Sequence, residues 1–279
     1  GVAVCLITGC SSGFGLATAL HFARAGETVV AGVRHVARAT ELEYWCAREG
    51  LAVDVVTLDV DDEASVTRAV AGVVDAHGRL DVLVNNAGIG LSGAIEESTD
   101  ADVRQLFETN VFGPLRLLRS VLAVMRHQGG GVVVNISSLS GVVSAPFSGV
   151  YSATKFAVEA LSEALHYEVK PFGIRVAIVE PGRFATTAFN DNRLVAGPDA
   201  SPYSERRHRW DAAMERLPGR DQPAEADAVA LAVYEAATRD DHPLRRLVGA
   251  DAELVAGLRR DLDDASFEHT VRTALDFWD

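Results

Sequence analysis

Short apolar runs alternate with longer amphipathic segments along most of the chain. The apolar runs predict strands near residues 2–8, 27–33, 53–58, 80–84, 131–137, 173–179 and 245–249. Apolar residues at helical spacing predict helices near residues 14–25, 63–77, 100–127, 151–170 and 223–238. Because the strands are too uniformly apolar for one face to meet water, the alternation predicts an α/β fold. The expected architecture is a doubly wound parallel sheet of about seven strands that helices cover on both faces.

The regular alternation stops between residues 183 and 222. Prolines and glycines, among them Gly197, Pro198 and Pro218, interrupt any long element there. A long insertion beside the ligand edge of a sheet is usually functional, so we expect it to close over a substrate. Beyond about residue 243 we expect a helical extension that either covers the pocket or joins a subunit interface. The length of 279 residues suits one large α/β domain better than two small ones.

The overall composition argues against several kinds of partner. A net charge of −13 and a pI near 5.0 disfavour nucleic acid or an anionic membrane as the main partner. The first residues lack the pattern of a signal peptide, and the uncharged segment 128–154 is too rich in Ser and Gly for a membrane span. The three cysteines lack metal-binding spacing and suit a reducing compartment. We therefore expect a cytoplasmic protein with neither a membrane span nor a metal site.

A glycine-rich turn follows the first predicted strand. Residues 8–15 read TGCSSGFG, and the first predicted helix opens directly after them. Glycines in such a turn let the backbone approach a pyrophosphate, whose negative charge the helix N-terminus favours. The turn predicts nucleotide contacts from Gly9, Ser11, Ser12, Gly13, Phe14 and Gly15. A plain connection between a strand and a helix is the alternative that the turn alone leaves open.

The second predicted strand is followed by Arg34, where a dinucleotide fold would bind the adenosine ribose. An acidic residue there would accept hydrogen bonds from a free 2′-hydroxyl, whereas a guanidinium can bind a 2′-phosphate. We therefore expect NADP(H) to be favoured, with NAD(H) as the alternative. The alternative for Arg34 is an ordinary surface arginine in this arginine-rich chain.

The strongest chemical signal lies where the strand predicted near 131–137 meets the helix predicted from Tyr151. Tyr151 and Lys155 are four residues apart, so in a helix both side chains leave one face about one turn apart. Ser138 follows the apolar run, at the strand end where parallel sheets bind ligands. Three polar groups can therefore converge on one ligand, and we interpret them as a catalytic centre. The alternative is an amphipathic helix whose apolar stripe packs whatever Tyr151 does.

Several motifs occur together in the order typical of one family. They are TGCSSGFG at 8–15, LDV at 58–60, NNAG at 85–88, Asn110, NISS at 135–138, YSATK at 151–155 and PGRFAT at 181–186. Over about residues 2–190 the chain therefore resembles the short-chain dehydrogenase/reductase family. The stretch SAPFSGVYSATKFAVEAL, Arg34 and the tail after Pro243 look like the branch that contains 17β-hydroxysteroid and retinol dehydrogenases. The resemblance implies a Rossmann-type NAD(P)-binding domain over residues 1–279, commonly assembled as a homodimer or homotetramer.

The resemblance also implies roles for individual residues. Tyr151 would exchange a proton with the substrate oxygen, Lys155 would lower the pKa of Tyr151 and hold the nicotinamide ribose, and Ser138 would steady the substrate oxygen. The main chain at Asn110 would hold a water that connects Lys155 to solvent, and the Gly-Pro pair just after it favours a distortion of that helix. The further cofactor contacts are Asp59, Val60, Asn86, Ala87, Gly88, Pro181, Gly182, Phe184 and Thr186.

The predicted pocket has apolar walls. Near the predicted centre lie Leu139, Val143, Phe147, Phe184 and Phe189, and each of them suits either the pocket or the core. We expect an NADP(H)-dependent oxidoreductase that interconverts a ketone and a secondary alcohol on a hydrophobic small molecule, such as a steroid, retinoid or polyketide. The alternatives are an NAD(P)-dependent epimerase or dehydratase and a non-catalytic nucleotide-binding regulator on the same fold.

Overall fold

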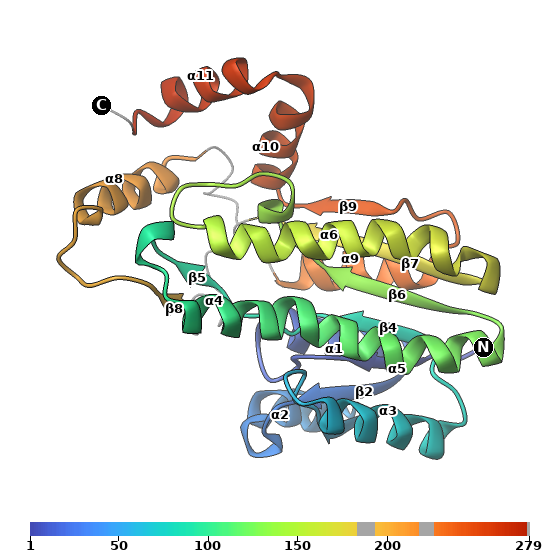
Figure 1. Cartoon of the computed structure of the whole chain (residues 1–279). Coiled ribbons are helices and arrows are strands. Elements are labelled where there is room, and N and C mark those ends of the chain that lie inside the picture. The colour runs from blue at the N-terminus through green and yellow to red at the C-terminus, as the bar shows by residue number, and fades with distance from the viewer. Residues whose placement is uncertain (183–192, 218–225, 278–279) are drawn as a thin grey trace.

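The computed structural model of the chain describes residues 1–182, 193–217 and 226–277 (Figure 1). Seven strands form one sheet in the order β3-β2-β1-β4-β6-β7-β9, and every neighbouring pair is parallel. The strands are β1(Val4–Ile7), β2(Thr28–Val33), β3(Val53–Thr57), β4(Val82–Asn85), β6(Gly131–Ile136), β7(Ile174–Pro181) and β9(Arg245–Val248). Each coincides with an apolar run that predicts a strand. The expected Rossmann-type parallel sheet is therefore confirmed.

Helices cover both faces of the sheet (Figure 1). The main ones are α1(Gly13–Arg24), α3(Glu63–His77), α5(Gly113–Gln128), α6(Gly149–Val169) and α9(Ala226–Thr238). On β1, Cys5 and Ile7 pack with α1 and α9, whereas Val4 and Leu6 pack with α3, α5 and α6. Successive side chains of a strand point to opposite faces, so a strand between two helical layers must be apolar at every position. Each fully buried side chain of this kind contributes roughly 1.5–3 kcal/mol to folding.

The parallel register brings the carboxyl ends of the strands to one edge of the sheet. Gly9, Arg34, Asn86, Ser138 and Gly182 follow five different strands and lie at this edge. The strand order also reverses beside β1, because the chain goes outward from β1 to β3 and then returns to β4. In open α/β sheets, the crevice at such a reversal is where ligands bind.

The long helix expected over residues 100–127 is interrupted. The structure has α4(Asp100–Phe107), a π-helical turn η3(Glu108–Phe112) and then α5. Pro114 stands in the first turn of α5, where it has no N–H to offer an intrahelical hydrogen bond. The expected distortion near Asn110 is therefore confirmed, and it takes the form of a π-turn, a feature that is frequent at functional sites.

Several elements are absent from the sequence prediction. They are α2(Thr40–Glu49), β5(Leu91–Ser92), β8(Leu194–Val195) and α8(Ser204–Glu215). Helix α2 buries only Leu42, and the apolar side chains of α8 begin at Trp210 after a run of charged residues, so neither helix has an apolar stripe along its whole length. Within the described residues, strands β5 and β8 form a separate parallel pair. Of the insertion expected to close over a substrate, residues 193–217 are described, and 183–192 and 218–222 lie outside the described residues.

Helices α8, α10(Ala250–Asp261) and α11(Asp264–Leu275) stand together beyond the carboxyl edge of the sheet, and we call these three helices the cap (Figure 1). Trp210, Ala213 and Met214 of α8 pack against Leu275 and Phe277. Trp210 and Phe277 meet edge to face, with ring centroids 5.2 Å apart. In the part of the chain that the structure describes, none of the helices is both long and apolar enough to cross a membrane.

Candidate active site

Close backbone contacts shape the glycine-rich turn between β1 and α1. Gly9 has φ +71 and Gly13 has φ +59, in the left-handed region that favours glycine. A Cβ on Gly15 would lie 2.0 Å from the Gly9 carbonyl oxygen, so no larger residue fits there. Ser11 and Ser12 line a large cavity beside the turn, at the N-terminus of α1. The turn is closely packed where Gly15 meets Gly9 and open to the cavity at Ser11 and Ser12. Such an arrangement fits the pyrophosphate of a dinucleotide.

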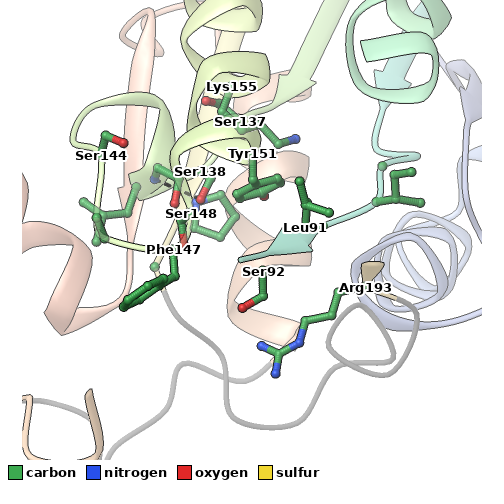
Figure 2. A pocket seen from close by; sticks show the side chains of 18 of the residues that line it. Leu91, Ser92, Ser137, Ser138, Ser144, Phe147, Ser148, Tyr151, Lys155 and Arg193 are labelled. Carbon is green, nitrogen blue, oxygen red and sulfur yellow. Dashed lines mark hydrogen bonds between the residues drawn. The ribbon is translucent and has the colours of Figure 1, made fainter. Parts of the chain in front are cut away.

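Ser138, Tyr151 and Lys155 come together at the wall of the same cavity (Figure 2). Ser138 follows β6, and α6 begins at Gly149, so Tyr151 and Lys155 stand in its first two turns. Lys155 Nζ lies 5.8 Å from the centre of the Tyr151 ring and donates to the Ile136 carbonyl oxygen at 3.1 Å. The convergence expected from the sequence is therefore present.

The surroundings of Tyr151 and Lys155 change their proton affinities. Burial of the phenol raises the pKa of Tyr151 to about 12, and a hydrogen bond with Ser138 acts in the opposite direction. Burial of the ammonium lowers the pKa of Lys155 to about 8, against the attraction of the nearby Glu159 carboxylate. At neutral pH the phenol therefore holds its proton, and Lys155 titrates close to the physiological range.

Asn110 occupies the π-turn and is buried. Its amide Nδ2 donates to the Ile89 carbonyl oxygen at 2.8 Å and to the Thr154 hydroxyl at 3.1 Å, while its Oδ1 accepts from the Ile89 N–H at 2.8 Å. Thr154 immediately precedes Lys155 on α6. The Asn110 side chain therefore ties the loop after β4 to the helix that carries Tyr151 and Lys155. This side chain does not line the cavity.

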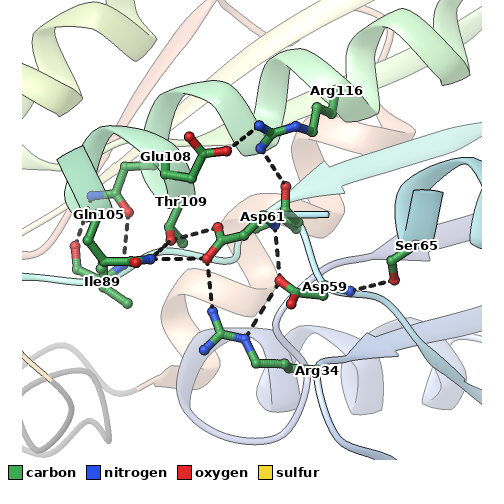
Figure 3. A network of polar contacts seen from close by, with 11 residues as sticks. Arg34, Asp59, Asp61, Ser65, Ile89, Gln105, Glu108, Thr109 and Arg116 are labelled. Carbon is green, nitrogen blue, oxygen red and sulfur yellow. Dashed lines mark hydrogen bonds and ion pairs between the residues drawn. The ribbon is translucent and has the colours of Figure 1, made fainter. Parts of the chain in front are cut away.

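Arg34 stands at the other end of the cavity, just after β2. Its Nε lies 3.7 Å from Asp59 Oδ1, and its Nη2 lies 3.4 Å from Asp61 Oδ2 (Figure 3). About half of the Arg34 side chain is exposed, and Arg34 lines the cavity together with His35 and Arg38. This end of the cavity therefore offers cationic groups beside a pair of carboxylates.

The cavity has a volume of about 1160 Å³ and reaches from Arg34 to the cap. Among its lining residues are these predicted site residues: Gly9, Ser11, Ser12, Gly13, Phe14, Arg34, Val60, Asn86, Ala87, Gly88, Ser138, Leu139, Val143, Phe147, Tyr151, Lys155, Pro181 and Gly182. Gly15, Asp59 and Asn110 do not line it: Gly15 packs on Gly9, Asp59 faces Arg34, and Asn110 lies behind the wall. Phe184, Thr186 and Phe189 lie outside the described residues.

The helical extension expected after about residue 243 is present and lines the cavity, whereas the sequence prediction named none of the individual residues of the cap and missed α8. Trp210 and Met214 of α8, Leu254 and Leu258 of α10, and Val271 of α11 line the cavity. Leu254 and Leu258 are one helical turn apart, which is a signal for one face of a helix but not for the surface that the face meets. Phe147 connects the loop after β6 with the cap, since it lines the cavity and packs with the apolar cluster of the cap. Its φ of +63 is unusual for a bulky residue.

The sequence prediction also missed a buried pair of carboxyl groups, in which Glu159 stands one turn after Lys155 on α6 and Glu180 stands on β7. Glu159 and Glu180 are 7% and 2% exposed, and their side chains share a hydrogen bond. Burial and the neighbouring Glu159 carboxylate raise the pKa of Glu180 to about 8, against the attraction of Arg245. Arg245 Nε donates to Glu159 Oε2 at 2.9 Å. Only the tertiary fold brings α6, β7 and β9 together here.

Sequence comparison gives a consistent family. The short chain dehydrogenase family model matches residues 3–195. A 3-ketodihydrosphingosine reductase from Bacteroides thetaiotaomicron is 42% identical over 194 residues, which are 69% of this chain and 68% of that protein. Human retinol dehydrogenase 8 is 38% identical over 185 residues, which are 65% of this chain and 58% of that protein.

Solved structures agree with these matches. A short-chain dehydrogenase from Streptomyces avermitilis superposes with a TM-score of 0.80 at 38% identity, over 100% of this chain and 97% of that chain. A Burkholderia phymatum enzyme solved with NAD has a TM-score of 0.80 at 27% identity, covering 96% and 95% of the two chains. A metagenomic enzyme solved with NADP has a TM-score of 0.70 at 26% identity, covering 88% and 96%. The chain therefore belongs to the short chain dehydrogenase family of oxidoreductases, as its motifs indicate.

Proposed function

We propose that the protein is an NADP(H)-dependent oxidoreductase that interconverts a ketone and a secondary alcohol on a hydrophobic small molecule. The observation that carries the proposal is the grouping of Ser138, Tyr151 and Lys155 at the wall of a cavity that also meets the glycine-rich turn. One cavity can then hold a dinucleotide and a second small molecule next to a proton donor.

The nucleotide would lie along the carboxyl edge of the sheet. Its pyrophosphate would meet the turn from Gly9 to Gly15, and its adenosine ribose would lie near Arg34. Val60, Asn86, Ala87, Gly88, Pro181 and Gly182 border the cavity between these ends and Lys155 and are proposed contacts. The bound dinucleotide supplies the hydride, and the protein supplies binding, orientation and proton transfer.

Tyr151 is the proposed general acid. Its raised pKa keeps the phenol protonated at neutral pH, which is the form that a carbonyl oxygen needs during reduction. The Ser138 hydroxyl, already hydrogen-bonded to the phenol, would also hold the substrate oxygen as negative charge develops on it. After Tyr151 gives up its proton, the Lys155 ammonium would stabilise the phenolate. Asn110 would act as a positioning residue, because its amide holds the loop after β4 against α6.

The apolar walls support a hydrophobic substrate. Beyond Tyr151 the cavity is bounded by Leu139, Val143 and Phe147 on the loop after β6 and by leucine, valine and aromatic side chains of the cap. An apolar substrate body would be buried against these walls, while Ser92, Ser144 and Ser148 also line the cavity and can bind a few polar groups of the substrate (Figure 2). Steroid-like, retinoid-like and polyketide-like compounds combine an apolar body with a carbonyl that can be reduced.

A binding titration followed by a substrate screen tests the proposal. NADPH and NADH are titrated separately while nicotinamide fluorescence is followed, and NADPH absorbance is then recorded with a panel of hydrophobic ketones. Tighter NADPH binding together with consumption of NADPH by a ketone is the expected result. Conversion of a substrate without net consumption of the nucleotide would instead point to an epimerase. Absence of binding to both nucleotides would contradict the proposal altogether.

A further inference from the structure

Arg34 is already paired with carboxylates where we propose that it meets a nucleotide. Its Nη2 lies 3.4 Å from Asp61 Oδ2, and its Nε lies 3.7 Å from Asp59 Oδ1 (Figure 3). Asp61 accepts from Nη2 and Asp59 attracts Nε, so a phosphate at this position must compete with two carboxylates for the guanidinium. An arginine at this position therefore does not by itself establish a preference for NADP(H).

Asp61 is the firmly held partner of this pair. Its Oδ1 accepts from the Thr109 hydroxyl at 2.7 Å, and its Oδ2 accepts from Gln105 Nε2 at 3.1 Å. The Asp61 side chain is 21% exposed, whereas the Arg34 side chain is 51% exposed. Asp61 is thus fixed from α4 and the π-turn, and Arg34 is the partner with room to move.

A 2′-phosphate at this place would meet two opposing effects. It carries close to two negative charges at neutral pH and would attract Arg34. The same phosphate would stand near the Asp61 carboxylate, so it must compete for the guanidinium and is repelled by a like charge. A free 2′-hydroxyl carries no charge and meets neither effect. The Asp61 charge therefore acts against NADP(H) while leaving NAD(H) nearly unaffected.

We propose that Asp61 is a specificity-determining residue that limits the preference of this protein for NADP(H) by holding Arg34. The inference rests on the proposed function, because it requires that the cavity bind a nicotinamide nucleotide. It concerns how Asp61 changes the ratio of NADPH to NADH affinity, whereas the proposed function is contradicted when neither nucleotide binds.

The test compares Asp61→Asn with a matched control. Asparagine keeps an oxygen that can accept from Thr109 but removes the charge. The control is Asp62→Asn, one residue away, where the carboxylate is 53% exposed and accepts from the Ala64 N–H at the start of α3. Asparagine also caps helices well, so this control removes the same charge with little effect on structure. Dissociation constants for NADPH and NADH are measured by nicotinamide fluorescence, and thermal melting without nucleotide verifies folding.

We expect Asp61→Asn to tighten NADPH binding roughly 2- to 5-fold, the range that a partly exposed ion pair supports. NADH binding and both affinities of Asp62→Asn should change by less than about twofold. An unchanged or lower ratio of NADPH to NADH affinity in Asp61→Asn would overturn the inference. If the wild-type protein binds neither nucleotide, the proposed function fails first, and this result is distinct from an unchanged ratio.

A double-mutant cycle tests whether the effect passes through Arg34. In an Arg34→Ala background, Asp61→Asn should change NADPH binding much less than in the wild type, because the guanidinium for which the phosphate competes is gone. An equally large effect in both backgrounds would overturn the proposed route. The cycle also remains informative if Asp61→Asn lowers the melting temperature, since each affinity is measured on folded protein below the transition.

Discussion

The two ends of the cavity are built in different ways. The proposed nucleotide end is formed largely by backbone, in a turn where Gly9 and Gly15 touch. The cap end is formed by side chains on α8, α10 and α11, which are far from that turn in the sequence. The family match covers residues 3–195 and stops before the cap. The shape of a site formed by backbone depends little on most side-chain substitutions, so such a site suits a cofactor that many related proteins share. The shape of a site formed by side chains changes with each substitution, so it suits a particular substrate.

Tyr151→Phe tests the centre between the two ends and should have the largest effect. The ring still packs, but the proton donor is lost, so kcat for ketone reduction should fall roughly 10²- to 10⁴-fold. Nucleotide affinity should stay nearly unchanged. Tyr167→Phe is the control, because Tyr167 lies on the same helix and is 69% exposed. Steady-state kinetics of both variants would separate the roles, and near-normal turnover of Tyr151→Phe would refute the assignment.

Gly15→Ala tests the backbone end. The added Cβ would lie 2.0 Å from the Gly9 carbonyl oxygen, so the turn must shift. We expect NADPH and NADH binding to weaken together by about tenfold or more, because both nucleotides share the pyrophosphate. Gly72→Ala is the control, since Gly72 lies within α3 with nothing near its Cβ position. That change should leave nucleotide binding intact and slightly favour the helix. Equal binding in the two variants, measured by fluorescence titration, would argue against the turn as the nucleotide site.

Leu254→Ser tests the side-chain end. Leu254 lines the cavity from α10 and is 42% exposed, so its loss should cost little stability. We expect KM for a hydrophobic ketone to rise roughly 3- to 10-fold, with NADPH affinity unchanged. Leu231→Ser on α9 is matched in exposure at 46% and lies away from the cavity, so KM should not change. If Leu254→Ser instead raised the dissociation constant of NADPH and left KM for the ketone unchanged, the assignment of the cap end to the substrate would be wrong.

Glu180→Gln tests the buried Glu159–Glu180 pair, which lies outside the cavity lining. Of the four substitutions it should have the smallest effect on activity. Glu180 has a pKa of about 8 in the folded protein, above the ordinary value of 4.5. A raised carboxyl pKa means that the contribution of this group to stability is full below about pH 4.5 and is lost as the pH rises to about 8. The melting temperature of the wild type should therefore fall over this interval more than that of Glu180→Gln. Parallel melting curves against pH would contradict the raised pKa.

The contrast between the two ends also explains what the sequence could predict. Strands, the glycine-rich turn and the grouping of Ser138 with Tyr151 and Lys155 follow from local patterns, and all are present in the structure. Pro114 and its preceding glycine likewise predict the break near Asn110. Helices α2 and α8 were missed because they bury few side chains and have no apolar stripe along their whole length.

Contacts between distant segments had no local signal. The wall supplied by Leu254, Leu258 and Val271 depends on where α10 and α11 pack, and the pairing of Arg34 with Asp61 depends on how α4 meets the end of β3. The prediction for Arg34 considered the residue alone and could not include the carboxylate that holds it. The residue type of Arg34 therefore indicated that it can bind a phosphate, and only the fold showed that the Asp61 carboxylate competes for the same guanidinium.

Deuterium transfer tests the central claim most directly. NADPH that carries deuterium at the transferable position of the nicotinamide is incubated with the wild-type protein and the hydrophobic ketone panel, and the products are analysed by mass spectrometry. The account predicts a secondary alcohol with deuterium on the former carbonyl carbon, formed at similar initial rates by the wild type and by Tyr167→Phe and roughly 10²- to 10⁴-fold more slowly by Tyr151→Phe. Product without deuterium, or labelling at an equal rate with Tyr151→Phe, would contradict it.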